Sequence, residues 1–251
     1  MKYSILDMVQ DILNDMDSDE VNSFDDTFEA AQVANIIRST YFAMMSNRNW
    51  PHMKKVIKFS SFSDSSLPTH MKLPERVKEL SLVNYNKVRK GETKKLYKPV
   101  KYIEPDAFLR RTNAYDSTQP NVEVIQDPTG VEILIKNDKA PEYYTSFNDV
   151  DLVFDSYDSE VDSILQSSKI QAHAYVFPLW EHRDSFIPDL PEEAFTALLE
   201  EAKSRAMVKL KQTADPKAEQ EAARQQRWLA RKAWSVSGGI KYPSYGRKGR
   251  K

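Results

Sequence analysis

Residues 122–135, VEVIQDPTGVEILI, contain the clearest structural signal in the chain. Two runs rich in β-branched residues, 122–125 and 131–135, flank the tetrapeptide Asp127-Pro128-Thr129-Gly130. Proline presets the φ angle of a type I turn, and glycine accepts the positive φ at the end of the turn. The pattern therefore predicts an antiparallel β-hairpin in the middle of the chain.

The expected β-structure extends on both sides of this hairpin. From Lys54 to Tyr85 the apolar residues recur at about every second position in short runs, which favours strands. Further strands are expected over 96–103, 143–154 and 170–180. Because Pro99 cannot donate to a ladder, the first of these strands should lie at a sheet edge. We expect a β-rich domain over 51–187.

Helices are expected on either side of the β-rich domain. Apolar residues recur every three or four positions over 5–16, behind the capping pattern Ser4-x-x-Asp7. A second amphipathic pattern over 28–45 predicts a longer helix that begins near Ser23 and pairs with the first. The two should form a helical hairpin.

Two more helices are predicted near the end of the chain. One begins at Leu190-Pro191-Glu192-Glu193 and should pack on the first two helices. The other runs from Pro216 to about Trp234, with few apolar residues except Ala223, Trp228, Leu229 and Trp234. An apolar stripe this thin requires a partner to cover it.

The predicted fold class is α+β. A helical bundle is formed by 1–50 and 188–234, an antiparallel β-rich domain over 51–187 is inserted into it, and an extended basic arm covers 235–251. At 251 residues with 40% hydrophobic residues the chain can bury a core. No apolar run is long enough to span a membrane and no signal peptide is evident, so we expect assembly in the cytoplasm and no membrane contact.

Charge is distributed unevenly although the formal net charge is −1. Nine acids and one lysine, Lys2, occupy the first thirty residues, whereas no acid follows Glu221. Chain ends of opposite charge favour head-to-tail association or docking on a charged partner. Two solvated termini would give the same pattern.

No motif predicts catalysis or a cofactor. The chain has no cysteine and no glycine-rich phosphate loop, and His52, His70, His173 and His182 lack metal-ligand spacing. The acids between Asp149 and Asp162 could hold a hard cation but lack the ligand order of an EF-hand. We expect no enzyme, no metal and no cofactor.

The basic and aromatic residues near the end of the chain are the candidate binding residues. They are Arg227, Trp228, Arg231, Lys232, Trp234, Lys241, Tyr242, Tyr245, Arg247, Lys248 and Arg250. Such a segment could bind phosphate, dock into another protein or remain a solvated tail. Docking is favoured, because tryptophans on a weakly apolar helix are costly to leave in water.

The order of these parts resembles the tail tubular protein A, or head-to-tail adaptor, family of short-tailed phages. The opening helices end at Asn47-Arg48-Asn49-Trp50, and Lys72-Leu73-Pro74 precedes several strands. Later, 175–180 (YVFPLW) precedes the helix that begins at 190–193 (LPEE), similar to the closing strand and helix of that family. The basic tail from Gly238 is a departure from the family pattern.

The resemblance implies a structural virion protein. Twelve subunits would form a ring on the portal protein, extend the channel through which double-stranded DNA passes without specific binding, and receive the tail nozzle or fibres. It implies that Arg227, Trp228, Arg231, Lys232, Trp234 and the tail from Lys241 bind the portal. The acidic first helix would suit a channel wall, because like charge keeps phosphate from adhering.

Two other functions remain open at this point. A nucleic-acid-binding accessory protein would use the same basic end, although the acidic first thirty residues disfavour a general affinity for nucleic acid. A carboxylate-based hydrolase would need a deep pocket with paired carboxylates of perturbed pKa.

Overall fold

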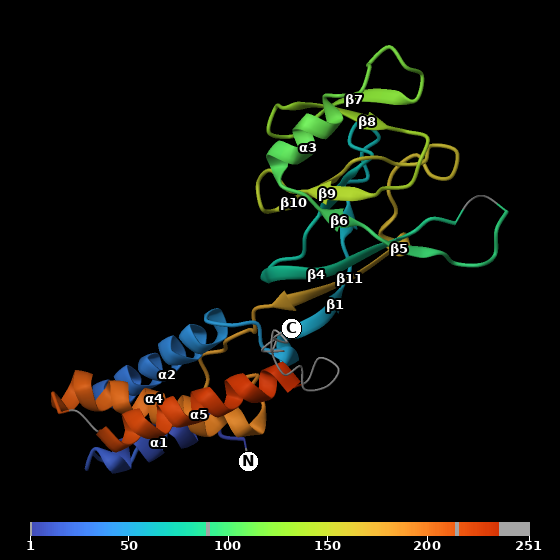
Figure 1. Ribbon diagram of the computed structural model, residues 1–251. Coiled ribbons are helices and arrows are strands. Elements are labelled where there is room, and N and C mark those ends of the chain that lie inside the picture. Colours follow the sequence, from blue (N-terminus) through green and yellow to red (C-terminus); the bar gives the residue numbers. More distant parts are fainter. Residues whose placement is uncertain (1, 89–90, 214–215, 236–251) are drawn as a thin grey trace, which may run out of the picture. The chain divides into compact units, whose positions relative to one another are not determined.

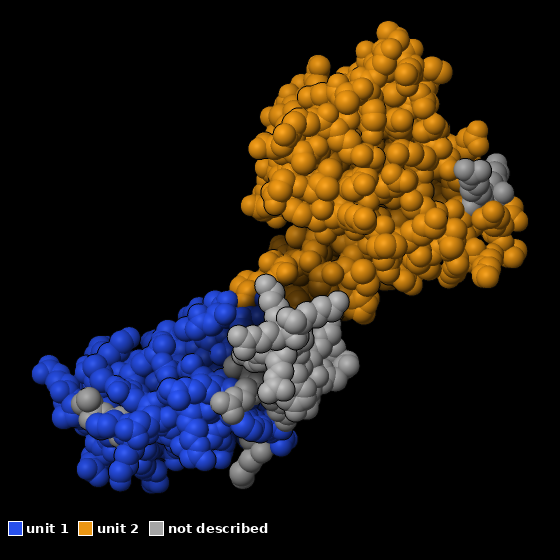
Figure 2. All heavy atoms as spheres, in the orientation of Figure 1, with its two compact units in different colours: residues 1–53, 178–251 blue, residues 54–177 orange. Residues whose placement is uncertain are grey.

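The structure is a computed structural model that describes residues 2–88, 91–213 and 216–235. The chain divides into two compact units (Figures 1 and 2). Unit 1 consists of 1–53 together with 178–251, and unit 2 is the intervening segment Lys54–Phe177. Helices and largely antiparallel sheets occur in separate parts of the chain, which confirms a mixed fold of the α+β class.

Unit 1 is built from helices. They are α1 (Ile5–Asp15), α2 (Phe28–Ser46), α4 (Glu192–Ala206) with a π-helical turn at Met207–Lys211, α5 (Pro216–Ser235) and a 3-10 turn at Pro51–Met53. The α1 helix packs against α2 and α4, α2 also packs against α4, and α5 packs on α4. The expected packing of α4 on the two N-terminal helices is therefore confirmed.

The first helix forms as its sequence predicts. The Ser4 hydroxyl accepts a hydrogen bond from the Asp7 N–H at 3.2 Å, and the Asp7 carboxylate accepts one from the Ser4 N–H at 2.9 Å. This capping box satisfies two of the N–H groups that the start of a helix leaves without partners. The buried residues Met8, Val9 and Ile12 form the inward face of α1.

The predicted start of α2 near Ser23 is wrong. The Asp26 carboxylate accepts hydrogen bonds from the N–H groups of Asn22 and Ser23, which holds this segment in a turn. The helix begins at Phe28 instead, with Thr27 as its N-cap. Phe28 was expected in the apolar stripe, but its side chain is 80% exposed.

Unit 2 contains two sheets, a separate hairpin and one helix. The first sheet has the order β1 (Lys54–Ile57), β11 (Ile170–Val176), β4 (Val77–Asn86) and β5 (Tyr97–Pro99). The second has the order β2 (Ser60–Ser61), β3 (His70–Lys72), β10 (Asp151–Phe154), β9 (Tyr143–Thr145) and β6 (Lys101–Tyr102). The remaining elements are β7 (Val122–Gln126), β8 (Glu132–Lys136), α3 (Pro105–Thr112) and a 3-10 turn at Ser167–Lys169.

The hairpin predicted from residues 122–135 is confirmed. Strands β7 and β8 pair antiparallel, with Val122 opposite Lys136. The Gly130 N–H donates to the Asp127 carbonyl at 2.7 Å, and Gly130 has a φ of +87°, which most other residues adopt at a cost.

The strand predicted over 96–103 is two strands in different sheets. The Val100 N–H donates to the Val83 carbonyl at 2.8 Å, whereas the Lys101 N–H donates to the Glu142 carbonyl at 2.9 Å. The chain therefore leaves the first sheet after β5, an edge strand as Pro99 required, and enters the second sheet at β6. One pair, β6 with β9, is parallel, which corrects the wholly antiparallel expectation.

The strand predicted over 170–180 is shorter than expected. It ends at Val176, and Pro178 follows, which has no N–H to donate to a ladder. Residues 178–187 cluster with unit 1, although they were expected in the β-rich domain.

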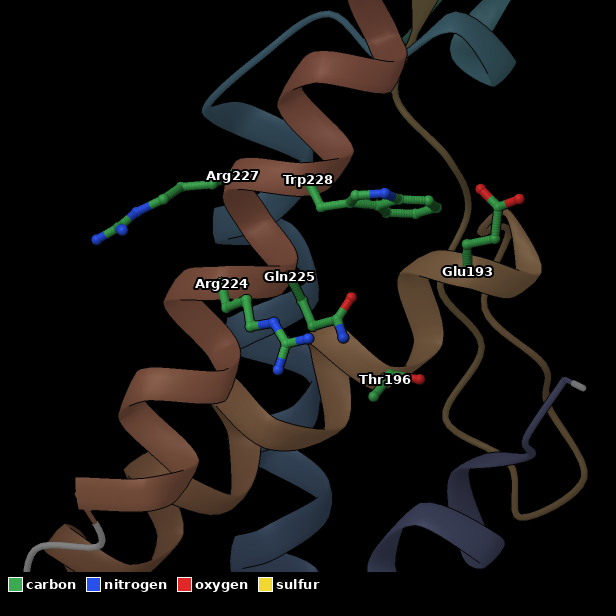
Figure 3. Close-up of a pocket in the computed structure, with 6 residues that line it drawn as sticks. All are labelled: Glu193, Thr196, Arg224, Gln225, Arg227 and Trp228. Carbon is green, nitrogen blue, oxygen red and sulfur yellow. The ribbon is translucent and has the colours of Figure 1, made fainter.

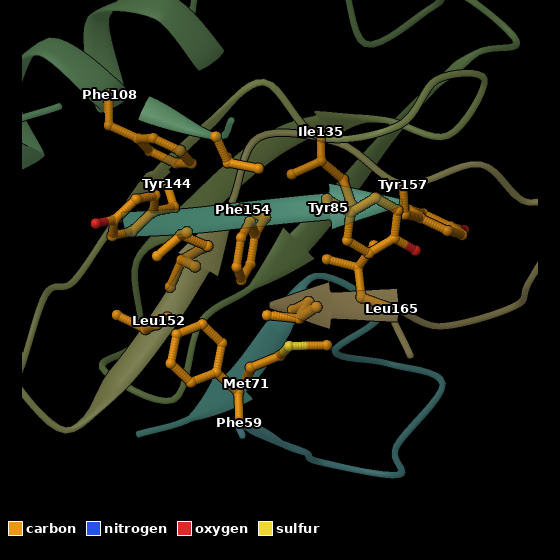
Figure 4. Packing of buried hydrophobic residues seen from close by; sticks show 14 of the residues in the cluster. Phe59, Met71, Tyr85, Phe108, Ile135, Tyr144, Leu152, Phe154, Tyr157 and Leu165 are labelled. Atoms are coloured by element: carbon orange, nitrogen blue, oxygen red, sulfur yellow. The ribbon is translucent and has the colours of Figure 1, made fainter. Parts of the chain in front are cut away.

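The core of unit 2 lies between its sheets and includes several aromatic rings (Figure 4). Its aromatic members are Phe59, Tyr85, Phe108, Tyr144, Phe154 and Tyr157. Burial raises the pKa of Tyr144 to about 12. Since burial of apolar surface is the main driving force of folding, this cluster gives unit 2 a core of its own.

Candidate functional site

The α5 helix packs on α4 along a narrow stripe of small residues. Its buried residues Ala218 and Ala222 lie one turn apart, and Leu229 continues the same stripe. The facing helix α4 also buries several alanines, among them Ala194 and Ala202. Small side chains on both helices bring the backbones close but leave the flanks of α5 uncovered.

A groove of about 650 Å³ runs along one flank of α5 (Figure 3). The α4 residues Glu193 and Thr196 line it on one side, and Arg224, Gln225, Arg227 and Trp228 line it on the other. The Trp228 ring extends over the groove toward Glu193, whereas the Arg227 side chain extends outward. Trp228 is 47% exposed, so much of its ring faces solvent.

Two hydrogen bonds order the polar side of this groove. The Gln225 amide donates to the Glu221 carboxylate at 2.7 Å, and Arg224 donates to the same carboxylate at 3.4 Å. Glu221 therefore holds both residues on one turn of α5. Because Arg224 and Trp228 are four residues apart on a helix, both face the groove together.

A second groove of about 450 Å³ lies along α5. It is lined by Glu201, Ser204, Arg205, Val208, Lys209, Glu219, Ala223 and Gln226. Val208, in the π-helical turn, is half exposed within it. Two grooves that contain exposed apolar side chains make α5 the best candidate for a protein-docking surface in unit 1.

Acidic residues surround α4 on the side of α1. Burial raises the pKa of Glu200, and the carboxylates of Asp15, Glu221 and Asp11 raise it further against the opposing effect of Lys203. Lys203 forms an ion pair with Asp15. Carboxylates from α1, α4 and α5 therefore lie near one another here, with Lys203 as a counter-charge.

The structure places only part of the predicted binding set. Arg227 and Trp228 are exposed residues that line the groove. Arg231, Lys232 and Trp234 lie in α5, but their side chains are outside the described part of the chain. Lys241, Tyr242, Tyr245, Arg247, Lys248, Arg250 and the arm 236–251 lie outside the described residues.

Four groove residues were not predicted as binding residues. Arg224 and Gln225 could have been found from their helical spacing to Trp228. Glu193 and Thr196 belong to a helix that is distant in sequence, and no local signal joins them to α5. Conversely, Ala223 was expected in the apolar stripe, but Ala218 and Ala222 are the buried alanines.

The acids between Asp149 and Asp162 are used within the fold. Asp155 is fully buried and accepts hydrogen bonds from the N–H groups of Glu142 and Tyr143 at 2.9 and 3.0 Å, and Asp162 pairs with Lys169. No group of three potential metal ligands occurs among residues 2–88, 91–213 and 216–235.

One histidine lies in an arrangement that resembles a catalytic dyad. His70 Nε2 is 2.8 Å from Asp127 Oδ1, and Thr69 Oγ1 is 3.4 Å from His70 Nδ1. All three residues are buried. A substrate would have no exposed face on which to react, so we interpret this group as structural.

Two further observations concern the whole described chain. No helix in it combines the length and the apolar composition that crossing a lipid bilayer requires. Comparison with protein-family models finds no match for this chain, and comparison with curated proteins finds no significant match.

Proposed function

We propose that this protein is a structural adaptor of a short-tailed phage, which forms a ring on the portal and connects the head to the tail. The observation that carries the proposal is the division of the chain. Its two ends form one helical unit, and a β-rich unit is inserted between them. This is the order of parts on which the resemblance to the adaptor family rests.

In this proposal the helical unit is a bundle that forms the ring. Each subunit would contact the next through two different surfaces. Such a heterologous interface forms a closed ring when the rotation from one subunit to the next adds up to a full turn. The α5 surface supports a docking role, since Trp228 is half exposed beside Arg224 and Arg227. Aromatic and arginine side chains are typical anchors of protein interfaces.

The acidic first helix fits the same proposal. Asp7, Asp11 and Asp15 recur every four residues, so they share one face of α1, and all three are exposed. A surface of like charge repels phosphate, so it would let DNA pass without binding it. The β-rich unit would offer the attachment surface for the tail nozzle or fibres.

The molar mass of the purified protein tests the proposal, measured by light scattering alone and after mixing with portal protein from the same phage. We expect a closed ring, either alone or on the portal. A chain truncated after Ala233 should fold but bind the portal more weakly, because it lacks the basic arm. A protein that stays monomeric at every ratio of portal to chain would contradict the proposed function.

A further inference from the structure

A second concentration of positive charge lies in unit 2, distant in sequence from the basic end of the chain. The segment 87–101 (KVRKGETKKLYKPVK) contains seven of the 36 basic residues and only one of the 37 acids, Glu92. It therefore carries a formal charge of +6, while the rest of the chain carries −7. We call this segment the basic finger.

Hydrogen bonds hold the finger at its base. The Lys87 N–H donates to the Leu96 carbonyl at 2.8 Å, and the Leu96 N–H donates to the Asn86 side-chain oxygen at 2.9 Å. Beyond this clamp, β4 and β5 pair with Tyr85 opposite Lys98. The described ends of the finger are thus anchored at the edge of the first sheet of unit 2, where β5 pairs with β4.

The described parts of the finger extend away from the sheet (Figure 1). A Cβ atom placed on Gly91 would meet no other atom within 4 Å, so the chain there is open to solvent. Lys94, Lys95 and Lys98 are exposed. Within the described residues no carboxylate forms an ion pair with any of these three lysines, so their charge is available to a partner.

Charges of both signs lie near Lys87 at the base of the finger. Burial lowers the pKa of Lys87, and the charges of Lys98 and Lys139 lower it further, while Glu142 and Asp155 oppose the shift. The positive charge offered to an anionic partner is therefore that of the exposed lysines Lys94, Lys95 and Lys98.

The composition of the finger distinguishes between anionic partners. Lysine is depleted in the cores of protein interfaces, where aromatic side chains and arginine are enriched. The described part of the finger has five lysines and no arginine, and Tyr97 is its one aromatic residue. The closely spaced phosphates of a duplex match such a density of point charges.

We propose that the exposed lysines Lys94, Lys95 and Lys98 of the basic finger bind the phosphate backbone of double-stranded DNA. Lysines on phosphate position a duplex but carry no sequence information, so binding is independent of sequence. The site is distinct from the basic end of the chain and does not depend on ring formation. In the full chain it would hold DNA beside unit 2, while the acidic α1 surface repels it.

Fluorescence anisotropy with a labelled duplex of about 20 base pairs and mixed sequence tests the site in the full-length protein at increasing salt. The test variant combines Lys94→Glu, Lys95→Glu and Lys98→Glu. The control combines Lys2→Glu, Lys54→Glu and Lys58→Glu, which are exposed lysines outside the finger with the same total charge change. Thermal melting of each variant checks that it is folded.

We expect the test variant to bind the duplex roughly tenfold more weakly or worse, with a salt dependence reduced by about three phosphate contacts. The control should bind as the wild type does. A chain that ends after Ser235 should keep finger-dependent binding. A second duplex of unrelated sequence should bind equally well.

Three results would overturn the proposal. One is a wild-type chain that does not bind duplex DNA at low salt. Another is an equal loss in test and control variants, or a loss on truncation alone, which would assign binding to net charge or to the basic end. The third is tighter finger-dependent binding of poly-glutamate than of the duplex, which would identify an acidic protein as the partner. The DNA-binding test does not depend on the portal, so each of these results could still be interpreted if the protein failed to bind the portal.

Discussion

His70 Nε2 donates a hydrogen bond to Asp127 Oδ1 across 2.8 Å, although the two residues are 57 positions apart in the chain. His70 lies in β3, and Asp127 begins the turn between β7 and β8. Asp127 also accepts hydrogen bonds from the N–H and hydroxyl groups of Thr129. One carboxylate therefore both orders the turn and attaches the hairpin to the second sheet of unit 2.

Removing this carboxylate should destabilise unit 2. Asp127→Ala leaves a buried imidazole N–H without an acceptor and removes the bond to Thr129, so we expect a loss of about 3 kcal/mol in the free energy of unfolding. Urea titration followed by fluorescence measures it. Glu132→Ala, at an exposed position of the same hairpin, is the control and should change little. Equal stability of both variants would show that the pair is dispensable.

The same pair predicts a pH dependence of stability. Burial lowers the pKa of His70 below its ordinary value of 6.5, although hydrogen bonding to Asp127 and the charges of Asp127 and Asp151 oppose the shift. The unfolded chain then binds the proton more tightly than the folded chain. The contribution of His70 to stability is therefore complete above about pH 6.5 and declines as the pH falls from there toward the lowered pKa.

His70→Gln provides the measurement, because glutamine can keep a hydrogen bond without titrating. Between about pH 7.5 and pH 5.5 the wild type should lose up to about 1 kcal/mol more unfolding free energy than the variant. Burial raises the pKa of Asp127, but the bonds from Thr129 and His70 outweigh it and lower the pKa below 3.8. A further loss is thus expected below about pH 3.8, and identical pH profiles would contradict the assignment to His70.

The aromatic core of unit 2 should be sensitive to truncation. Phe154 is fully buried against Tyr144, with ring centroids 5.9 Å apart. Phe154→Ala should cost about 3 to 5 kcal/mol, because it removes apolar contacts and leaves a cavity. Val150→Ala, at an exposed position in the loop before β10, should stay within about 0.5 kcal/mol of wild type. Chemical denaturation of both variants makes the comparison.

Substitutions at the adjacent residues Trp228 and Leu229 of α5 can distinguish a role in docking from a role in folding. Trp228 is 47% exposed and Leu229 only 4% exposed. We expect Trp228→Ala to leave the Tm of the free chain nearly unchanged, whereas Leu229→Ala should lower it, since a buried leucine replaced by alanine costs about 2 to 5 kcal/mol. A large drop in Tm for Trp228→Ala would assign that ring to the core of unit 1.

Several local elements follow directly from neighbouring residues. The capping box of Ser4 and Asp7, the turn from Asp127 to Gly130, and the restart of helix at Pro216 each depend on side chains within a few positions of one another. Sequence alone could therefore place these elements and the α+β class.

Other features depend on contacts between distant segments, and sequence alone missed them. The turn before α2, which Asp26 orders locally, is also held by Asp184, whose carboxylate accepts a hydrogen bond from the Phe24 N–H at 3.1 Å. The predicted strand breaks at Val100 because the Val100 N–H bonds to the first sheet and the Lys101 N–H bonds to the second sheet. Local sequence propensity can predict a strand, but it cannot predict which of two sheets that strand joins.

The binding surfaces divide in the same way. The composition of α5 predicts exposed tryptophan and arginine, because its apolar residues are too few to cover them. The packing of the helices brings Glu193 and Thr196 of α4 to the groove beside Trp228, and the packing of the hairpin brings Asp127 to His70. The physical reason is that composition and spacing act over one or two helical turns, whereas burial and long-range hydrogen bonds depend on how the elements pack.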